Sequence, residues 1–197
     1  MSVNETFHAS PGEELANAIT HGIGALLAVA GSVVLLIYAD SRLMVSISVY
    51  AGSLILLYLA STLYHSLIFT RARGLFRKFD HMAIFLLIAG TYTPFCFTAL
   101  HGWLRWTMLG AVWGCALAGI VLKALFTGKF EWLSLMVYIF SGWMVILAIK
   151  PIYESLSAWS FGLLISGGLS YTVGTVFYVN KRIPYSHSIW HLWVLAG

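Results

Sequence analysis

Residues 131–150, EWLSLMVYIFSGWMVILAIK, decide the fold of the chain. A charged residue stands at each end, and 18 uncharged and mostly apolar residues lie between them. A helix that spans a membrane needs roughly 20 largely apolar residues. This stretch therefore predicts a helix that crosses a bilayer.

Five further runs of the same kind lie along the chain, each with at least 17 uncharged residues between charged ones. Apolar residues make up 60% of the 197 residues and charged residues 9%, whereas soluble domains have about 45–50% and about 25%. We expect one polytopic, all-α, seven-transmembrane helix bundle that occupies residues 1–197 as a single domain. A mobile cytoplasmic tail over 1–12 precedes spans at about 18–39, 43–68, 80–100, 103–122, 132–149, 157–179 and 185–197.

The last expected span is short. From His187 to Gly197 there are 11 residues, which is about 16 Å of helix at 1.5 Å per residue. The hydrocarbon core of a bilayer is about 30 Å thick. We therefore expect the seventh helix to be incomplete, as in a truncated chain.

Basic residues indicate the orientation of the bundle. Eight of them fall on one side, four in the basic loop expected over Thr70–Phe79 and four in the fourth-to-fifth and sixth-to-seventh connections. These are Arg71, Arg73, Arg77, Lys78, Lys123, Lys129, Lys181 and Arg182, against Arg42, Arg105 and Lys150 on the other side. Because short loops rich in Lys and Arg stay in the cytoplasm, we expect a cytoplasmic N-terminus.

Three histidines suggest a metal site. In the stretch 185–195, YSHSIWHLWVL, His187 and His191 stand four residues apart, which places them on one face of a helix in apolar surroundings. The expected topology puts His65, at the end of the second span, in the same inner leaflet. Catalytic zinc sites typically use three protein ligands and a water molecule. The pattern therefore predicts zinc bound by His65, His187 and His191.

Asp80 and Ser61 are the candidate catalytic residues. Asp80 opens the third span in the same leaflet, so it is placed to accept a proton from a zinc-bound water as a general base. Ser61 lies one turn deeper than His65 on the same helix face, within reach of a reacting carbonyl group. The alternatives are that Asp80 is an acid favoured at a helix start and that the Ser61 hydroxyl bonds back within its own helix.

Glu14, Asn17 and His21 share a helix face at spacings of three and four residues. They serve either as hydrogen-bonding partners of the zinc ligands or as a helix cap followed by a polar stripe. The basic residues are distributed as topology determinants, so nucleic acid is not expected as a partner. The partners to consider are membrane lipids, including a lipid substrate, and further copies of the chain.

Four segments carry a family resemblance. Residues 61–65 (STLYH), 79–81 (FDH) and 187–191 (HSIWH) match the Ser-x3-His, Asp and His-x3-His motifs of the progestin and adipoQ receptor family, and residues 14–22 match its Glu-x2-Asn-x3-His signature. The chain resembles this family over nearly its whole length, with all motifs in family order. The resemblance is strongest for the bacterial branch, the hemolysin III-like proteins.

The resemblance implies seven helices in a bacterial inner membrane, with a cytoplasmic N-terminus and zinc near the inner leaflet. It assigns the zinc ligands to His65, His187 and His191, places the zinc water at Asp80, and puts the Ser61 hydroxyl close to it. Related proteins include the adiponectin and progestin receptors, and alkaline ceramidases, which hydrolyse a lipid amide with the same kind of site.

These residues favour a zinc-dependent membrane hydrolase of a lipid amide or ester. One alternative is a pore-forming cytolysin, against which stands the clustering of polar groups at one depth instead of along a full path. The other alternative is a receptor or sensor of membrane homeostasis, in which zinc is structural and ties the helices together.

Overall fold

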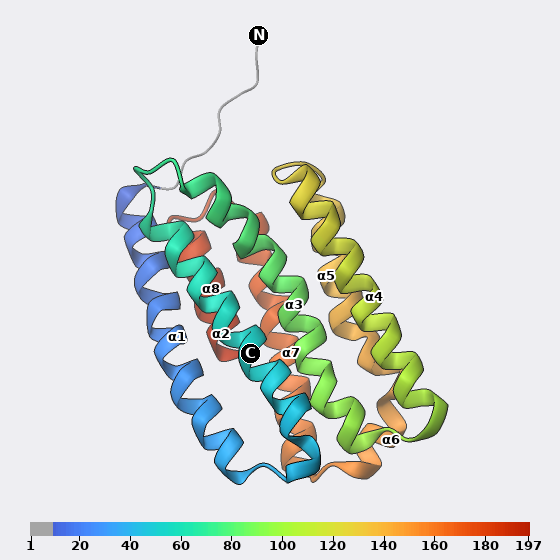
Figure 1. Ribbon diagram of the computed structural model, residues 1–197. Helices are drawn as coiled ribbons and strands as arrows, with labels where there is room; N and C mark the ends of the chain where they lie inside the picture. Colours follow the sequence, from blue (N-terminus) through green and yellow to red (C-terminus); the bar gives the residue numbers. More distant parts are fainter. Residues whose placement is uncertain (1–9) are drawn as a thin grey trace.

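The structure is a computed structural model and describes residues 10–197, which are almost entirely helical. The elements are α1 (Pro11–Tyr38), η1 (Ser41–Leu43), α2 (Met44–Ser66), α3 (Arg73–Ala99), α4 (Gly102–Phe126), α5 (Glu131–Trp143), η2 (Met144–Ala148), α6 (Ile149–Ser155), α7 (Ala158–Val179) and α8 (Ser186–Ala196) (Figure 1). Within residues 10–197, six helical segments are long and apolar enough to cross a membrane, and α5, η2 and α6 together form one of them. The expected polytopic helical bundle is confirmed.

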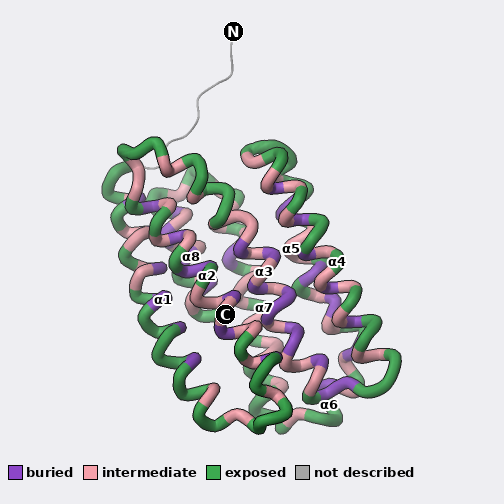
Figure 2. Tube along the Cα trace, viewed as in Figure 1, coloured by how far each residue is buried: buried purple, intermediate pink, exposed green. Residues whose placement is uncertain are grey.

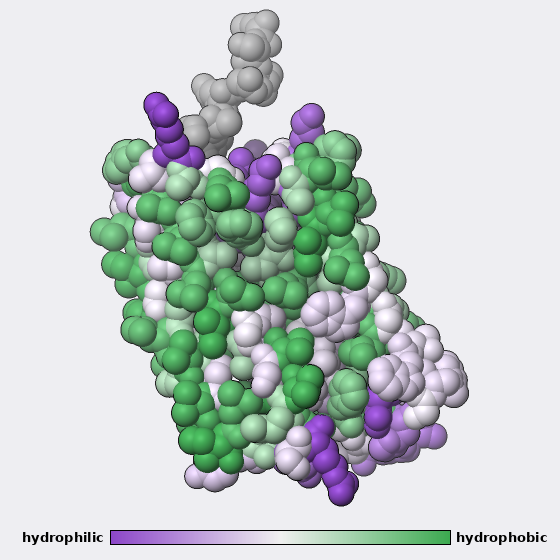
Figure 3. All heavy atoms as spheres, viewed as in Figure 1, coloured by the Kyte–Doolittle hydropathy of each residue, from purple (hydrophilic) through white to green (hydrophobic). Residues whose placement is uncertain are grey.

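Helices that follow one another in the sequence pack against each other, and the last helix returns to pack against the first. Helices α1 to α4 lie side by side, and α8 packs against both α7 and α1 (Figure 1). The start of α1 and the α2–α3, α4–α5 and α7–α8 connections all lie at one end of the bundle, the end that carries the eight basic residues. Hydrophobic side chains cover most of the face in Figure 3, and hydrophilic ones gather toward its two ends. This distribution suits a lipid-facing belt.

Helix α1 begins earlier than expected. Residues 1–9 of the expected tail lie outside the described residues, but Pro11 and Gly12 are helical, so the expectation that the tail extends to residue 12 is wrong. The Ser10 side chain caps the helix by accepting a hydrogen bond from the Glu13 N–H, and Pro11 occupies the first turn. Ser-x-x-Glu with proline at the first position is a helix-start signal.

The basic loop before α3 is also shorter than expected, because α3 begins at Arg73 and not near residue 80. An apolar run ends where charged residues begin. A helix can continue through those residues, because Arg and Lys are good helix formers. Asp80 consequently lies about two turns inside α3. The helix continues through Pro94 up to Ala99.

The fifth span, expected over 132–149, is present as one segment long and apolar enough to cross a membrane, Glu131–Ser155, but it is not a continuous α-helix. A 3₁₀ segment, η2, separates α5 from α6. The hydroxyl of Tyr92 on α3 donates to the Gly142 carbonyl and accepts from the Val145 N–H, both at 2.7 Å. A side chain that inserts into the backbone ladder is a known cause of such breaks.

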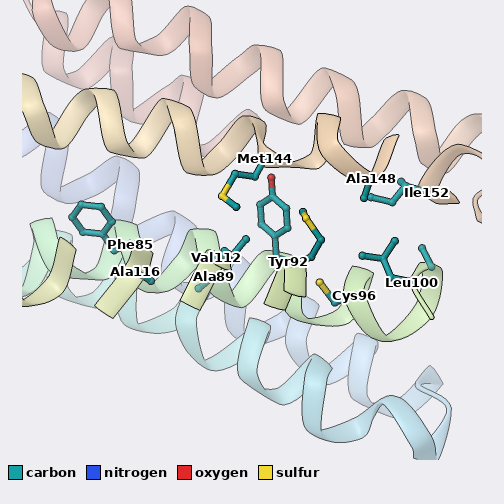
Figure 4. Close-up of a cluster of buried hydrophobic side chains, with 12 residues drawn as sticks. Phe85, Ala89, Tyr92, Cys96, Leu100, Val112, Ala116, Met144, Ala148 and Ile152 are labelled. Atoms are coloured by element: carbon teal, nitrogen blue, oxygen red, sulfur yellow. The ribbon is translucent and has the colours of Figure 1, made fainter. Parts of the chain in front are cut away.

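Two buried clusters hold the helices together (Figure 2). The larger one lies between α3, α4 and the α5–η2–α6 segment, and Figure 4 shows the Tyr92 hydroxyl pointing toward the segment that carries Met144. The smaller one joins α1, α2, α3 and α8, with Leu57, Tyr58 and Val194 among its members. This second cluster fixes α8 against α1 and α2, directly beside the histidines.

Candidate metal centre

The structure brings the three histidines of the expected zinc site together. His65 lies in the last turn of α2, while His187 and His191 lie on the first turns of α8. One ligand nitrogen from each lies within 4.8 Å of the others. The ring centroids are 5.2 Å apart for His65 and His187, 5.0 Å for His65 and His191, and 4.7 Å for the α8 pair.

The nitrogen atoms of His65 indicate that this cluster fits a metal ion. Nδ1 lies 2.6 Å from Oε2 of Glu14, so it donates its hydrogen to the carboxylate. Nε2 is buried and has no hydrogen-bond partner within residues 10–197. A buried polar atom without a partner is costly. A metal ion bound at Nε2 would satisfy this atom, and the other two imidazoles would complete a three-ligand site.

Helix α1 contributes several residues that contact these imidazoles, among them Glu14 and Asn17. The second carboxylate oxygen of Glu14 accepts a hydrogen bond from Arg73, so Glu14 bridges the arginine and His65. Asn17 is fully buried, and its backbone oxygen lies 3.3 Å from His191 Nδ1, from which it can accept a hydrogen bond. Such partners fix the tautomer and the ring orientation of metal-binding histidines.

His21 reaches the cluster in another way. Its ring stacks on His191, with centroids 3.5 Å apart and planes inclined by 5°. Both of its nitrogens are buried and without hydrogen-bond partners in the part of the chain that the structure describes. His21 therefore supports the His191 ring by stacking, and it makes no hydrogen bond there.

Ser61 and Asp80 both line the cavity that contains the histidines. Ser61 is 1% exposed, and its hydroxyl has no partner among the described residues, so the alternative of a bond within its own helix is not observed. The carboxylate of Asp80 lies 3.7 Å from Nδ1 of its neighbour His81. Because Asp80 lies well inside α3, it is not the helix-start acid of the alternative interpretation.

The cavity has a volume of about 1650 Å³ and extends along the bundle. Drug-sized ligand pockets occupy about 300–1,000 Å³. Its lining at the histidine end includes Glu14, Asp80 and Lys181, and its lining toward the other end includes Phe95 and Leu163. The cavity is thus strongly polar at one end and mostly apolar along the rest, which suits an amphiphilic ligand.

Lys181 stands in the α7–α8 connection at the polar end. Burial lowers the pKa of its ammonium group, and the nearby Glu13 carboxylate acts against that shift. The Lys181 ammonium also lies 5.0 Å from the centre of the Tyr178 ring. Lys181 itself is exposed, so this end of the cavity carries a solvent-accessible cation.

Three residues near the site were not expected from the sequence. Arg73 binds Glu14, the Ser188 hydroxyl donates to the Asn17 side chain at 2.6 Å, and Glu13 accepts a hydrogen bond from the backbone of α8. All three depend on contacts between helices that are distant in the chain. The sequence carries a signal for Glu13 alone, as part of the helix-start pattern of α1.

Known proteins identify the family. The family model of haemolysin-III related proteins matches residues 10–197. The chain belongs to this family. It is 47% identical to "Hemolysin-3" of Bacillus cereus over 189 residues, which cover 94% of the chain and 86% of that protein. It is 49% identical to "Hemolysin-3 homolog" of Bacillus subtilis over 189 residues, covering 94% and 89%.

A more distant relative extends the relationship to animals. The chain is 28% identical to the human "Monocyte to macrophage differentiation factor" over 194 residues, covering 94% of the chain and 79% of that protein. The resemblance to the hemolysin III branch of the progestin and adipoQ receptor family is thereby confirmed. The chain is an integral membrane protein of this family.

Proposed function

We propose that the protein is a zinc-dependent integral membrane hydrolase of a lipid amide or ester, similar in chemistry to a ceramidase. One observation carries the proposal. Three imidazoles, one with a buried nitrogen that has no partner within residues 10–197, converge at the polar end of a cavity that is otherwise mostly apolar. A metal ion at that end would meet the polar head of a lipid whose chain occupies the rest of the cavity.

Zinc is the metal that the ligands favour, because a site of three neutral imidazoles is a known zinc ligand set. His65, His187 and His191 would hold it. When bound, zinc polarises a carbonyl group and lowers the pKa of a coordinated water to about 7. The hydrogen bond that His65 Nδ1 donates to Glu14 keeps the His65 proton on Nδ1 and the lone pair on Nε2, which is the tautomer that metal binding at Nε2 requires.

Two residues of the cavity wall would perform the remaining steps. The Asp80 carboxylate accepts the proton of the attacking water and returns it to the leaving amine or alcohol. The Ser61 hydroxyl, buried and without a partner among the described residues, donates a hydrogen bond to the carbonyl oxygen as negative charge develops on it. Ser61 lines the cavity from α2, one turn from His65, and Asp80 lines it from the neighbouring α3.

We further propose that the protein lies in the bacterial inner membrane with a cytoplasmic N-terminus and the zinc site toward the cytoplasmic leaflet. The eight basic residues at the histidine end, against three at the other end, support this orientation. A cysteine-accessibility experiment on intact cells tests it, with a single cysteine introduced at Arg71 or at Arg42 in a variant that lacks Cys96 and Cys115.

The activity is tested with purified, zinc-loaded protein and labelled lipid amides and esters in mixed micelles. We expect hydrolysis by the wild type and none by Asp80→Asn, while the zinc content of both proteins stays equal. If neither lipid class is hydrolysed and Asp80→Asn has no effect in cells, the proposal is wrong.

A structural metal is the second candidate. The ligands join α2 to α8, and the one ion contact of Asp80 within residues 10–197 is to His81, not to the three imidazoles. A sensor or receptor would then use zinc to hold these helices together, and chelation would lower stability without any turnover to lose. The cytolytic activity that the relatives' names suggest predicts liposome leakage that persists in His187→Ala.

A further inference from the structure

The start of α8 is capped from another helix. Its N-cap residue, Tyr185, adopts a left-handed conformation with φ of 56° and provides no side-chain cap within the described chain. The first N–H groups of a helix need acceptors. The N–H of His187 donates to Oε1 of Glu13, on α1, at 3.2 Å.

Glu13 is itself in the first turn of α1. Its backbone N–H donates to the Ser10 hydroxyl at 3.2 Å, as in a capping box. In that motif the glutamate side chain turns back to its own helix start. Here Oε1 of Glu13 instead accepts from α8, so the residue serves the ends of two helices.

A second contact fixes the same two turns against each other. A Cβ atom added to Gly12 would lie only 2.9 Å from the Tyr185 hydroxyl, so α1 approaches the cap residue of α8 closely at this glycine. The approach places Oε1 of Glu13 within hydrogen-bond reach of the first N–H groups of α8, which have no acceptor within their own helix.

We infer that Glu13 is a positioning residue that caps α8 and thereby sets the place of the His187 imidazole. The inference rests on the proposed metal site, because its consequence is the geometry of one ligand. Glu13 accepts from the backbone of His187, the same residue whose ring completes the cluster.

The other ligands are held independently of Glu13. His191 Nδ1 lies 3.3 Å from both the Asn17 carbonyl and the Thr20 hydroxyl, and His65 is held by Glu14. Loss of the cap should therefore disturb His187 selectively, leaving two ligands in place.

Two conservative variants separate the hydrogen bond from the charge. Glu13→Gln keeps an oxygen at the same reach and loses the charge, whereas Glu13→Asp keeps the charge and is one methylene shorter. Glu154→Asp is the matched control, since Glu154 is exposed at the other end of the bundle, 4.0 Å from Lys150. Thus Glu13→Gln should behave as wild type, and Glu13→Asp should not.

The first measurement is amide hydrogen exchange of the peptide that contains His187, in metal-free full-length protein. Loss of an N-cap acceptor should speed exchange at the start of α8 by about tenfold in Glu13→Asp, with Glu13→Gln and Glu154→Asp unchanged. Equal exchange rates in Glu13→Asp and wild type would overturn the inference. Faster exchange in Glu13→Gln, with an unchanged rate in Glu13→Asp, would also overturn it.

The second measurement is the affinity for zinc and the visible spectrum of the cobalt-substituted protein, which reports ligand geometry. We expect affinity about tenfold weaker and an altered cobalt spectrum in Glu13→Asp, restored in Glu13→Gln. An unchanged affinity and spectrum in Glu13→Asp would contradict the positioning role. A wild-type protein that binds no metal would instead contradict the proposed function. The hydrogen-exchange experiment would still show whether Glu13 caps α8.

Discussion

Oε2 of Glu14 lies 2.6 Å from Nδ1 of His65, and this contact determines which nitrogen of the imidazole can bind a metal. The carboxylate accepts the Nδ1 hydrogen, so the lone pair resides on Nε2. Arg73 binds the other carboxylate oxygen and holds it in place. A residue at the start of α1 thus prepares a ligand at the end of α2.

Replacement of Glu14 by glutamine tests this relationship. Glutamine has one amide oxygen, so it cannot accept hydrogen bonds from both His65 and Arg73, and the His65 tautomer is not enforced. We expect zinc affinity to fall about 10- to 100-fold, as for other partners of metal-binding histidines. Competition with a chelator of known affinity measures the change, with Glu154→Gln as control. A Glu14→Gln protein with wild-type affinity would show that the contact does not serve metal binding.

Replacement of Ser61 by alanine should separate activity from stability. The buried Ser61 hydroxyl has no partner within residues 10–197, so its removal leaves no other group unsatisfied and should not lower stability. If it stabilises the oxyanion, hydrolysis should slow by about 10²–10³-fold. Turnover and thermal unfolding are measured on the same preparation. Full activity in Ser61→Ala would remove Ser61 from the mechanism.

Replacement of Tyr92 by phenylalanine should destabilise the fold. It removes the hydroxyl that bonds both Gly142 and Val145, and leaves a backbone carbonyl and an N–H unsatisfied at the helix break. We expect a loss of about 1–3 kcal/mol in the free energy of unfolding. Denaturant unfolding in detergent measures it, with the exposed Tyr153→Phe as control. No loss would mean that water replaces the hydroxyl.

Removal of the metal should lower the thermal unfolding temperature. A ligand that binds only the folded state stabilises it by about 2.7 kcal/mol at a concentration 100 times its dissociation constant. Chelation should therefore lower the transition of the wild type, and readdition of zinc should restore it. The same treatment should have no effect on His65→Ala. A chelator effect that persists in this variant would place the metal elsewhere.

Much of the fold follows from the sequence, because the bilayer requires long apolar helices. The span expected over 157–179 agrees with α7 (Ala158–Val179) to within one residue at its start. The expected helix boundaries are wrong where features other than hydropathy determine where a helix starts or breaks. Hydropathy does not locate the start of α3 at Arg73, and it does not show that Tyr92 interrupts the fifth span from another helix.

The candidate site divides in the same way. The i, i+4 spacing of His187 and His191, and a common depth with His65, suffice to predict the cluster. The roles of Glu13 and Arg73 cannot be predicted similarly, because they depend on how α1 packs against α8 and α3. Depth in the membrane follows from topology, whereas contacts between helices follow from packing.

The most direct test of the account is the zinc content of the purified protein. We expect one zinc ion per chain in the wild type, and its loss when His65, His187 and His191 are all replaced by alanine in a protein that remains helical. A wild type without zinc after purification and zinc addition would contradict the account, as would a triple variant that retains it.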